Sequence, residues 1–161
     1  MVGSAQESSE RISLSSLRIT VQLKSGAGRC EAVPIDSYID AERRCVMVRI
    51  YGEFTHDEIV ETINRCVRDP EFRPGFKVLS DHTAVKVPVT PSQAKQMVEH
   101  LVNLADAFAG TRWAAVTSQP ASYGMMRMVS VHAERVPVEV QIFSSLEEAE
   151  AWLDSVEEGD G

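Results

Sequence analysis

The alternation of apolar and polar positions predicts extended segments in the first third of the chain. Every second residue of 17–23 is apolar, which is the pattern of a half-buried strand. Residues 35–40 and 45–52 are also strand-like, and the polar turn between them predicts a hairpin. Three later apolar runs, 76–79, 112–117 and 138–143, predict further strands.

Between these strands, apolar residues recur at helical spacing, which predicts helices. The helix after Thr55 has Glu58 three positions on, which is the spacing of a capping box. A second helix begins at Thr90, which has Gln93 three positions on and proline at the first helical position, and its apolar spacing runs to Gly110. Two more helices are predicted to start near 118 and at Ser145.

The order of these elements predicts the fold class. After the hairpin, helices and strands alternate to the end of the chain, and this alternation is typical of a mainly parallel sheet with helices on its faces. We therefore expect an α/β fold with right-handed crossovers, an antiparallel hairpin at the N-terminal side and four helices.

Composition and charge narrow the function classes. A chain of 161 residues that is 43% hydrophobic and 25% charged fits one domain with a sizeable core. No apolar run reaches the roughly 20 residues of a membrane span, and the polar first residues do not form a secretory signal. These features predict a cytoplasmic protein without stable membrane insertion.

The acidic residues gather at one end of the chain. Of the formal net charge of −8, seven negative charges come from residues 144–161, which leaves −1 for the rest. No basic stripe with interleaved aromatic residues is present, so nucleic acid is not an expected partner. The three cysteines and four histidines are scattered and match no metal-ligand spacing, so neither a metal nor a cofactor is expected.

Several phrases of the sequence resemble a known family. They are VMVRIYGEFTHDEI, FKVLSDHTAV, RWAAVTSQPASYGMMRM and VEVQIFSSLEEAEAWL. In this order and spacing they resemble the STAS-like domains, more narrowly the bacterial SpoIIAA-like (STAS/Sec14-like) branch, from about Ile35 to Leu153. The resemblance implies a STAS-like domain over 34–157. Outside it we expect a disordered lead-in (1–16), a strand extension (17–33) and an acidic end (158–161).

The resemblance also implies two kinds of function. Members that antagonise anti-sigma factors are phosphorylated on a serine at the start of the helix after the third strand. The corresponding region here, VPVTPSQA, offers Thr90 and Ser92 but lacks the Asp-Ser-containing pattern. The Sec14-like comparison instead suggests a lipid or another apolar small molecule. A homodimer and a regulatory protein partner are further expectations from this resemblance.

Polar residues beside predicted strands are the main candidates for chemistry. Asp81 and His82 follow a buried run, and three interpretations fit them. They form an acid–base pair, they make a polar contact to a ligand, or they end a strand in the ordinary way, with Asp81 accepting hydrogen bonds from backbone N–H groups. Ser118 lies where α/β sheets bind anions, but it also fits a plain helix cap.

The third predicted helix is apolar almost all round. Met125, Met126 and Met128 fit a core, a dimer contact or the wall of an apolar pocket, and Arg127 among them needs a partner. Taken together, these features predict a non-enzymatic module that binds an apolar ligand, with an interaction switch at Thr90 or Ser92 as the alternative. The residues expected to contact the ligand are Asp81, His82, Ser118, Tyr123, Met126 and Arg127.

Overall fold

The computed structural model describes residues 34–155, which form a five-stranded sheet, four α-helices and one short 3-10 helix. The strands are β1 (Ile35–Asp40), β2 (Cys45–Gly52), β3 (Lys77–Val85), β4 (Thr111–Val116) and β5 (Val138–Phe143). The helices are α1 (His56–Arg68), α2 (Pro91–Asn103), α3 (Pro120–His132), η2 (Ala133–Arg135) and α4 (Leu146–Asp154). The predicted lead-in, the predicted strand in 17–23 and the acidic end lie outside the described residues.

The sheet is mixed, as the order of elements predicted. β1 pairs with β2 in an antiparallel hairpin in which Asp40 lies opposite Cys45, and every later pairing is parallel. The turn closes with Arg44 at a φ of 51°, in the left-handed region. The predicted α/β class with a hairpin, a mainly parallel sheet and four helices is therefore confirmed.

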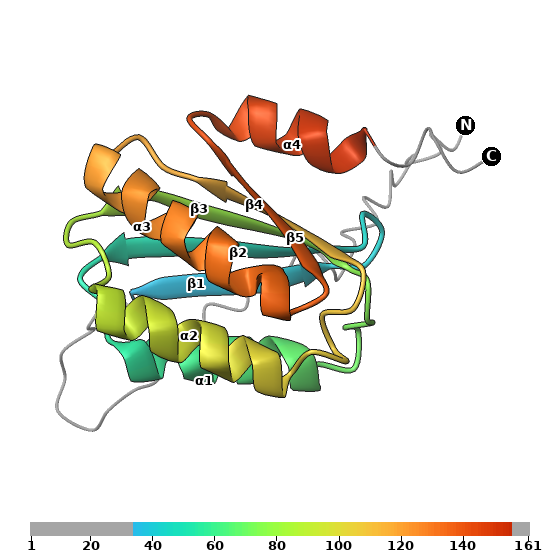
Figure 1. Cartoon of the computed structure of the whole chain (residues 1–161). Coiled ribbons are helices and arrows are strands. Elements are labelled where there is room, and N and C mark those ends of the chain that lie inside the picture. The colour runs from blue at the N-terminus through green and yellow to red at the C-terminus, as the bar shows by residue number, and fades with distance from the viewer. Residues whose placement is uncertain (1–33, 156–161) are drawn as a thin grey trace, which may run out of the picture.

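The strands follow one another in the sheet in chain order, β1-β2-β3-β4-β5. Each parallel crossover therefore moves one strand in the same direction, and crossovers of one hand place their helices on one face. Figure 1 shows this arrangement, with α1, α2 and α3 on one face of the sheet and α4, alone among the helices of residues 34–155, on the other.

The starts of α1 and α2 are fixed by the capping boxes that the sequence predicted. Thr55 Oγ1 accepts a hydrogen bond from the Glu58 N–H, and the Glu58 carboxylate accepts one from the Thr55 N–H. Thr90 and Gln93 make the same pair of bonds at α2. The second helix ends at Asn103, earlier than its apolar spacing indicated, because residues 104–110 continue as turns that still bury Phe108.

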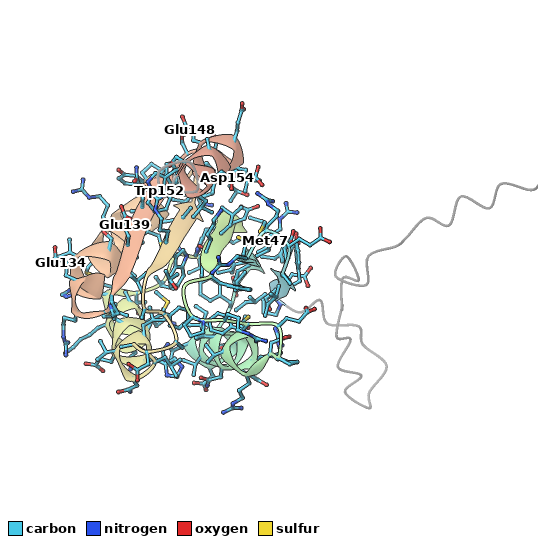
Figure 2. The ribbon with its side chains drawn as sticks, turned by 90° about the vertical axis from the view of Figure 1, so that its right-hand side faces the viewer. Met47, Glu134, Glu139, Glu148, Trp152 and Asp154 are labelled. Carbon is cyan, nitrogen blue, oxygen red and sulfur yellow. The ribbon has the colours of Figure 1, made fainter. Side chains whose placement is uncertain are left out.

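The α4 face of the sheet carries its own small core. Ala149 and Leu153 of α4 pack on Leu79 of β3 and Ala114 of β4, and all four side chains are buried. The guanidinium of Arg112 lies 3.8 Å from the ring centre of Trp152 and also hydrogen-bonds Glu139 at 3.2 Å. Figure 2 shows α4 above the sheet, with Trp152 between the helix and Glu139 on β5.

The larger core lies on the other face, between the sheet and helices α1, α2 and α3. Three clusters of buried apolar side chains occupy it. Their sheet residues occupy alternate positions along the strands, including Val46 and Ile50 of β2 and Val78 of β3. This face also contains a cavity between the two layers.

Candidate functional site

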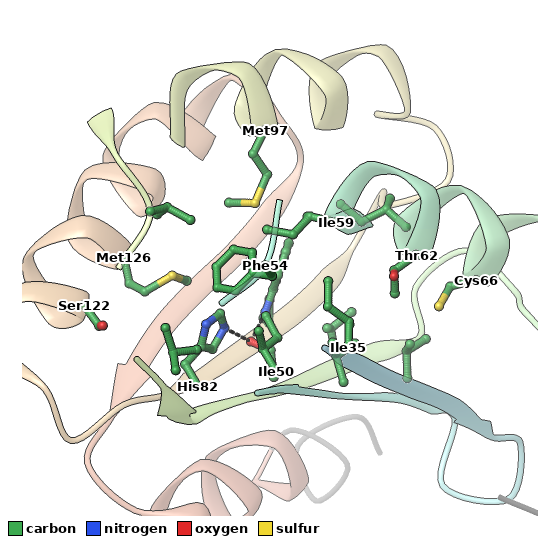
Figure 3. A pocket seen from close by; sticks show the side chains of 18 of the residues that line it. Ile35, Ile50, Phe54, Ile59, Thr62, Cys66, His82, Met97, Ser122 and Met126 are labelled. Atoms are coloured by element: carbon green, nitrogen blue, oxygen red, sulfur yellow. Dashed lines mark hydrogen bonds between the residues drawn. The ribbon is translucent and has the colours of Figure 1, made fainter. Parts of the chain in front are cut away.

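A cavity of about 80 Å³ lies between the sheet and helices α1, α2 and α3. Aliphatic, aromatic and thioether side chains make up most of its wall, and Figure 3 shows them converging from both layers. Among the described residues that line it, none is Asp, Glu, Lys or Arg. The polar groups in the wall belong to Thr62, Ser80, His82, Trp113 and Ser122.

The length and shape of β3 bring His82 into this wall. The sequence predicted a short strand over 76–79 with Asp81 and His82 beyond it, but β3 continues to Val85. Arg49 pairs with Asp81 and Tyr51 pairs with Ala84, so three steps along β3 match two steps along β2. This extra residue is a β-bulge, which reverses the alternation of side chains. Because of it, both His82 and Val85 face the cavity.

Asp81 stabilises the bulge from the opposite face of the sheet. Its Oδ1 accepts hydrogen bonds from the Thr83 N–H at 2.9 Å and the Thr83 hydroxyl at 2.6 Å. Its Oδ2 lies 3.3 Å from Arg49 Nε, and Asp81 is buried. Neighbouring residues of a strand point to opposite faces, so Asp81 does not reach the imidazole of His82 as an acid–base partner.

Ser80, His82 and Trp113 form a hydrogen-bonded chain on the sheet side of the cavity. Trp113 Nε1–H donates to Ser80 Oγ at 2.8 Å, and Ser80 Oγ lies 3.0 Å from His82 Nε2. Burial lowers the pKa of His82 to about 4, and the charge of Asp81, which favours the protonated form, offsets only part of this shift. The imidazole is therefore neutral near pH 7.

The hydrogen bonds of this chain select one tautomer of His82. An indole N–H only donates, so Ser80 Oγ accepts from Trp113. If His82 also donated through Nε2, the hydroxyl hydrogen of Ser80 would have no acceptor within residues 34–155. We therefore assign the proton of His82 to Nδ1, with Ser80 donating to Nε2. The Nδ1–H then has no hydrogen-bond partner among the described residues.

Ser122, near the start of α3, contributes a second unpaired polar group. Its side chain is only 5% exposed, and its Oγ has no hydrogen-bond partner within the described part of the chain. The Gln119 side-chain N–H donates to the Val85 carbonyl at 2.6 Å, which ties the start of α3 to the end of β3. Figure 3 shows Ser122, His82 and Met126 at one end of the cavity, with Thr62 and Cys66 at the other.

The residues predicted to contact a ligand fall into two groups. His82 and Met126 line the cavity, where Met126 is one helical turn after Ser122. Asp81 is on the other face of the sheet, whereas Ser118, Tyr123 and Arg127 are exposed. Arg127 therefore does not need the buried partner that its apolar neighbours suggested.

The predicted switch residues lie outside the cavity. Thr90 and Ser92 are both exposed at the start of α2. Thr90 Oγ1 accepts the capping hydrogen bond of Gln93, so the threonine has the structural role that its spacing predicted. Regulation at either residue stays a prediction.

Sequence reasoning missed four polar residues of the wall: Thr62, Ser80, Trp113 and Ser122. Ser80 lies two positions before His82, so a strand predicted to reach His82 would have put both side chains on one face. Ser122 and Met126 share a helix face by their spacing of four. No local signal indicates that Trp113 binds Ser80, because the two residues are 33 positions apart.

Within the described residues, the cavity holds neither an activated thiolate nor a cluster of metal ligands. Burial raises the pKa of the Cys66 thiol, so this cysteine is not an activated thiolate. Within residues 34–155, no group of three or more His, Cys, Asp or Glu side chains is placed to hold a metal ion. Of the described helices, none has the length and apolar character required to cross a membrane.

Comparison with known proteins identifies the fold. Neither a known protein family nor a curated protein matches the sequence. The structure is similar to the crystal structure of an uncharacterised DUF3478-family protein with a SpoIIAA-like fold from Shewanella loihica PV-4. The TM-score is 0.52 at 16% sequence identity, and the match covers 74% of this chain and 93% of that chain. The chain thus has a SpoIIAA-like fold, as its sequence phrases predicted.

Proposed function

We propose that the protein is a non-enzymatic binding module that holds a small, largely apolar molecule in the cavity between the sheet and helices α1–α3. The observation that carries the proposal is an apolar cavity with a few convergent polar groups, which is the usual composition of a ligand site. Met97, Met125 and Met126 contribute flexible thioethers to the wall, and such side chains adapt to ligands of different shape.

The size of the cavity limits the ligand. An apolar cavity of roughly 150 Å³ admits benzene, and the cavity here has about half that volume. It therefore accepts a molecule smaller than benzene as it stands. After the methionine side chains move, it also accepts a molecule of about benzene's size or the end of a longer, lipid-like molecule. Pro88 and Val89 of the loop before α2 are half-buried and border the cavity, and a longer molecule would extend along them.

The Ser80–His82 pair supports ligand anchoring better than catalysis. Its separation of 3.0 Å would suit a nucleophile and its general base. However, Ser80 is 1% exposed and also accepts the Trp113 N–H, and no carboxylate within residues 34–155 orients His82 through Nδ1. A serine-directed phosphonate that labels Ser80 would contradict the non-enzymatic proposal.

Xenon binding tests the proposed cavity directly. We expect xenon to shift the NMR signals of the three methionine methyl groups that line it, because apolar cavities of this kind bind xenon. The variant Val89→Phe should weaken the effect by at least about tenfold by narrowing the cavity, since an added ring cannot share that volume. The matched control is Val87→Phe in the same loop, where the side chain is 54% exposed and outside the wall.

Native mass spectrometry extends the test to the natural ligand. Protein purified from its own host should carry a small organic molecule that solvent extraction removes. A protein that is consistently free of ligand and also fails to bind xenon would contradict the proposal. The same spectra, with sedimentation analysis, check the predicted homodimer.

An interaction switch at the start of α2 is the second candidate function. The hydroxyl of Ser92 is exposed and makes no hydrogen bond within the described residues, so it is open to a kinase. A phosphate there would be stabilised by the N-terminal end of the helix dipole. This candidate predicts a phosphopeptide covering residues 89–95 and a changed partner affinity for Ser92→Glu. Unaltered partner binding by both Thr90→Glu and Ser92→Glu would contradict it.

A further inference from the structure

The polar groups of the cavity are concentrated at one end, where β3 ends and α3 begins. His82 comes from the bulge of β3, and Ser122 comes from the first turn of α3. The bond from Gln119 to the Val85 carbonyl holds these two elements together. The end near Thr62 and Cys66 differs, because the Thr62 hydroxyl already donates to the Glu58 carbonyl in its own helix.

We infer that this polar end recognises one uncharged hydroxyl or carbonyl group, so that the ligand is a neutral alcohol or ketone rather than a carboxylate, a phosphate or an amine. The inference rests on the proposed function and specifies its ligand class. Its basis is the pair of unused hydrogen-bonding groups at His82 and Ser122.

The hydrogen-bonding capacity of the two side chains matches such a group. The Nδ1–H of His82 donates, and the hydroxyl of Ser122 both donates and accepts. A carbonyl oxygen has two lone pairs and can accept from both residues, and a ligand hydroxyl can accept from one and donate to the other. A buried hydroxyl without a partner is costly, so filling this capacity contributes to affinity.

The absence of charge in the wall excludes ionic ligands. Among the described residues, no lining side chain carries a formal charge, and the imidazole of His82 is neutral near pH 7. Transfer of an unpaired ion from water into an apolar site costs far more than transfer of a hydroxyl that finds hydrogen bonds. A carboxylate or an ammonium group of the same chain length should therefore bind much more weakly than the alcohol.

A matched series of short ligands tests the inference on the full chain at pH 7. The probes are 1-butanol, butanoate and butylammonium, and the readout is the shift of the methionine methyl signals in an NMR titration. We expect 1-butanol to bind at least about tenfold more tightly than either ion, because the ions lose their hydration without gaining a partner.

Two serine variants separate hydrogen bonding from packing. Ser122→Ala should weaken 1-butanol binding about fivefold, the typical effect of one lost hydrogen bond, and should leave xenon binding unchanged. Ser118→Ala is the matched control, because Ser118 is an exposed serine beside the start of the same helix and lies outside the wall. It should affect neither probe.

The outcomes distinguish this inference from the proposed function. If xenon binds but butanoate binds as tightly as 1-butanol, the ligand class is wrong and the apolar cavity stands. The same holds if Ser122→Ala leaves the affinity for 1-butanol unchanged. If neither xenon nor any of the three probes binds, the proposed function fails and the inference fails with it.

Discussion

At the scale of single residues, His82 couples the stability of the fold to pH. Its folded pKa of about 4 lies below the ordinary value of 6.5. Between these values the unfolded chain holds a proton on His82 that the folded chain does not. The free energy of unfolding therefore falls as the pH decreases from 6.5 to 4.

The variant His82→Gln isolates this effect. Over that pH interval we expect the wild-type protein to lose about 2 kcal/mol more stability than the variant. This is less than the full pKa shift implies, because His82 as a residue is only partly buried. Urea unfolding of both proteins at pH 7 and pH 4 measures the difference. Equal losses in the two proteins would show that His82 titrates normally in the fold.

Asp81 supports the site from the opposite face of β3. Asp81→Ala removes the acceptor of both Thr83 hydrogen bonds and the partner of Arg49, so we expect a loss of about 2 kcal/mol in urea unfolding. Asp36→Ala is the control, because Asp36 is an exposed aspartate on β1 that lies opposite Arg49 of β2. This substitution should change the free energy of unfolding by less than about 0.5 kcal/mol. Similar losses in the two variants would remove the structural role assigned to Asp81.

At the scale of elements, the helix starts are where the sequence is most informative. Thr90→Ala removes the side-chain acceptor of the Gln93 N–H, and we expect it to lower the free energy of unfolding by about 1 kcal/mol. Ser92→Ala, two residues later and equally exposed, should stay within about 0.5 kcal/mol of wild type. The two values come from chemical unfolding, and a Ser92→Ala loss as large as that of Thr90→Ala would contradict the capping assignment.

The contrast between α2 and β3 explains what could be predicted. Capping boxes and helical spacing are local, since a hydroxyl and the N–H groups it binds are three residues apart, and both boxes were predicted correctly. The end of β3 depends on pairing with β2, which is distant in sequence, and on a bulge that disrupts the alternation from His82 onward. The apolar run that predicted this strand ends at Leu79, because the next strand positions are polar, so the strand was predicted too short.

At the scale of the whole molecule, the cavity is a property of assembly. Thr62, Trp113 and Ser122 come from α1, β4 and α3, and only the packing of three helices on one face brings them together. The apolar pattern shows which side chains face the core, but it is the same whether those side chains fill the space between sheet and helices or leave a cavity there. The fold class could therefore be predicted from the sequence, whereas the cavity and most of its polar groups could not.

Within residues 34–155, α4 covers the other face of the sheet by itself, and its packing tests the layer arrangement. Leu153 of α4 is 2% exposed against Leu79 and Ala114 of the sheet, so Leu153→Ala should cost about 3 kcal/mol by leaving a void. Leu146, in the same helix, is 44% exposed, and Leu146→Ala should cost less than about 0.5 kcal/mol. Urea unfolding gives both values. Because α4 covers the face away from the cavity, Leu153→Ala should leave xenon binding unchanged under native conditions, and a loss of xenon binding would mean that the two faces of the sheet are not independent.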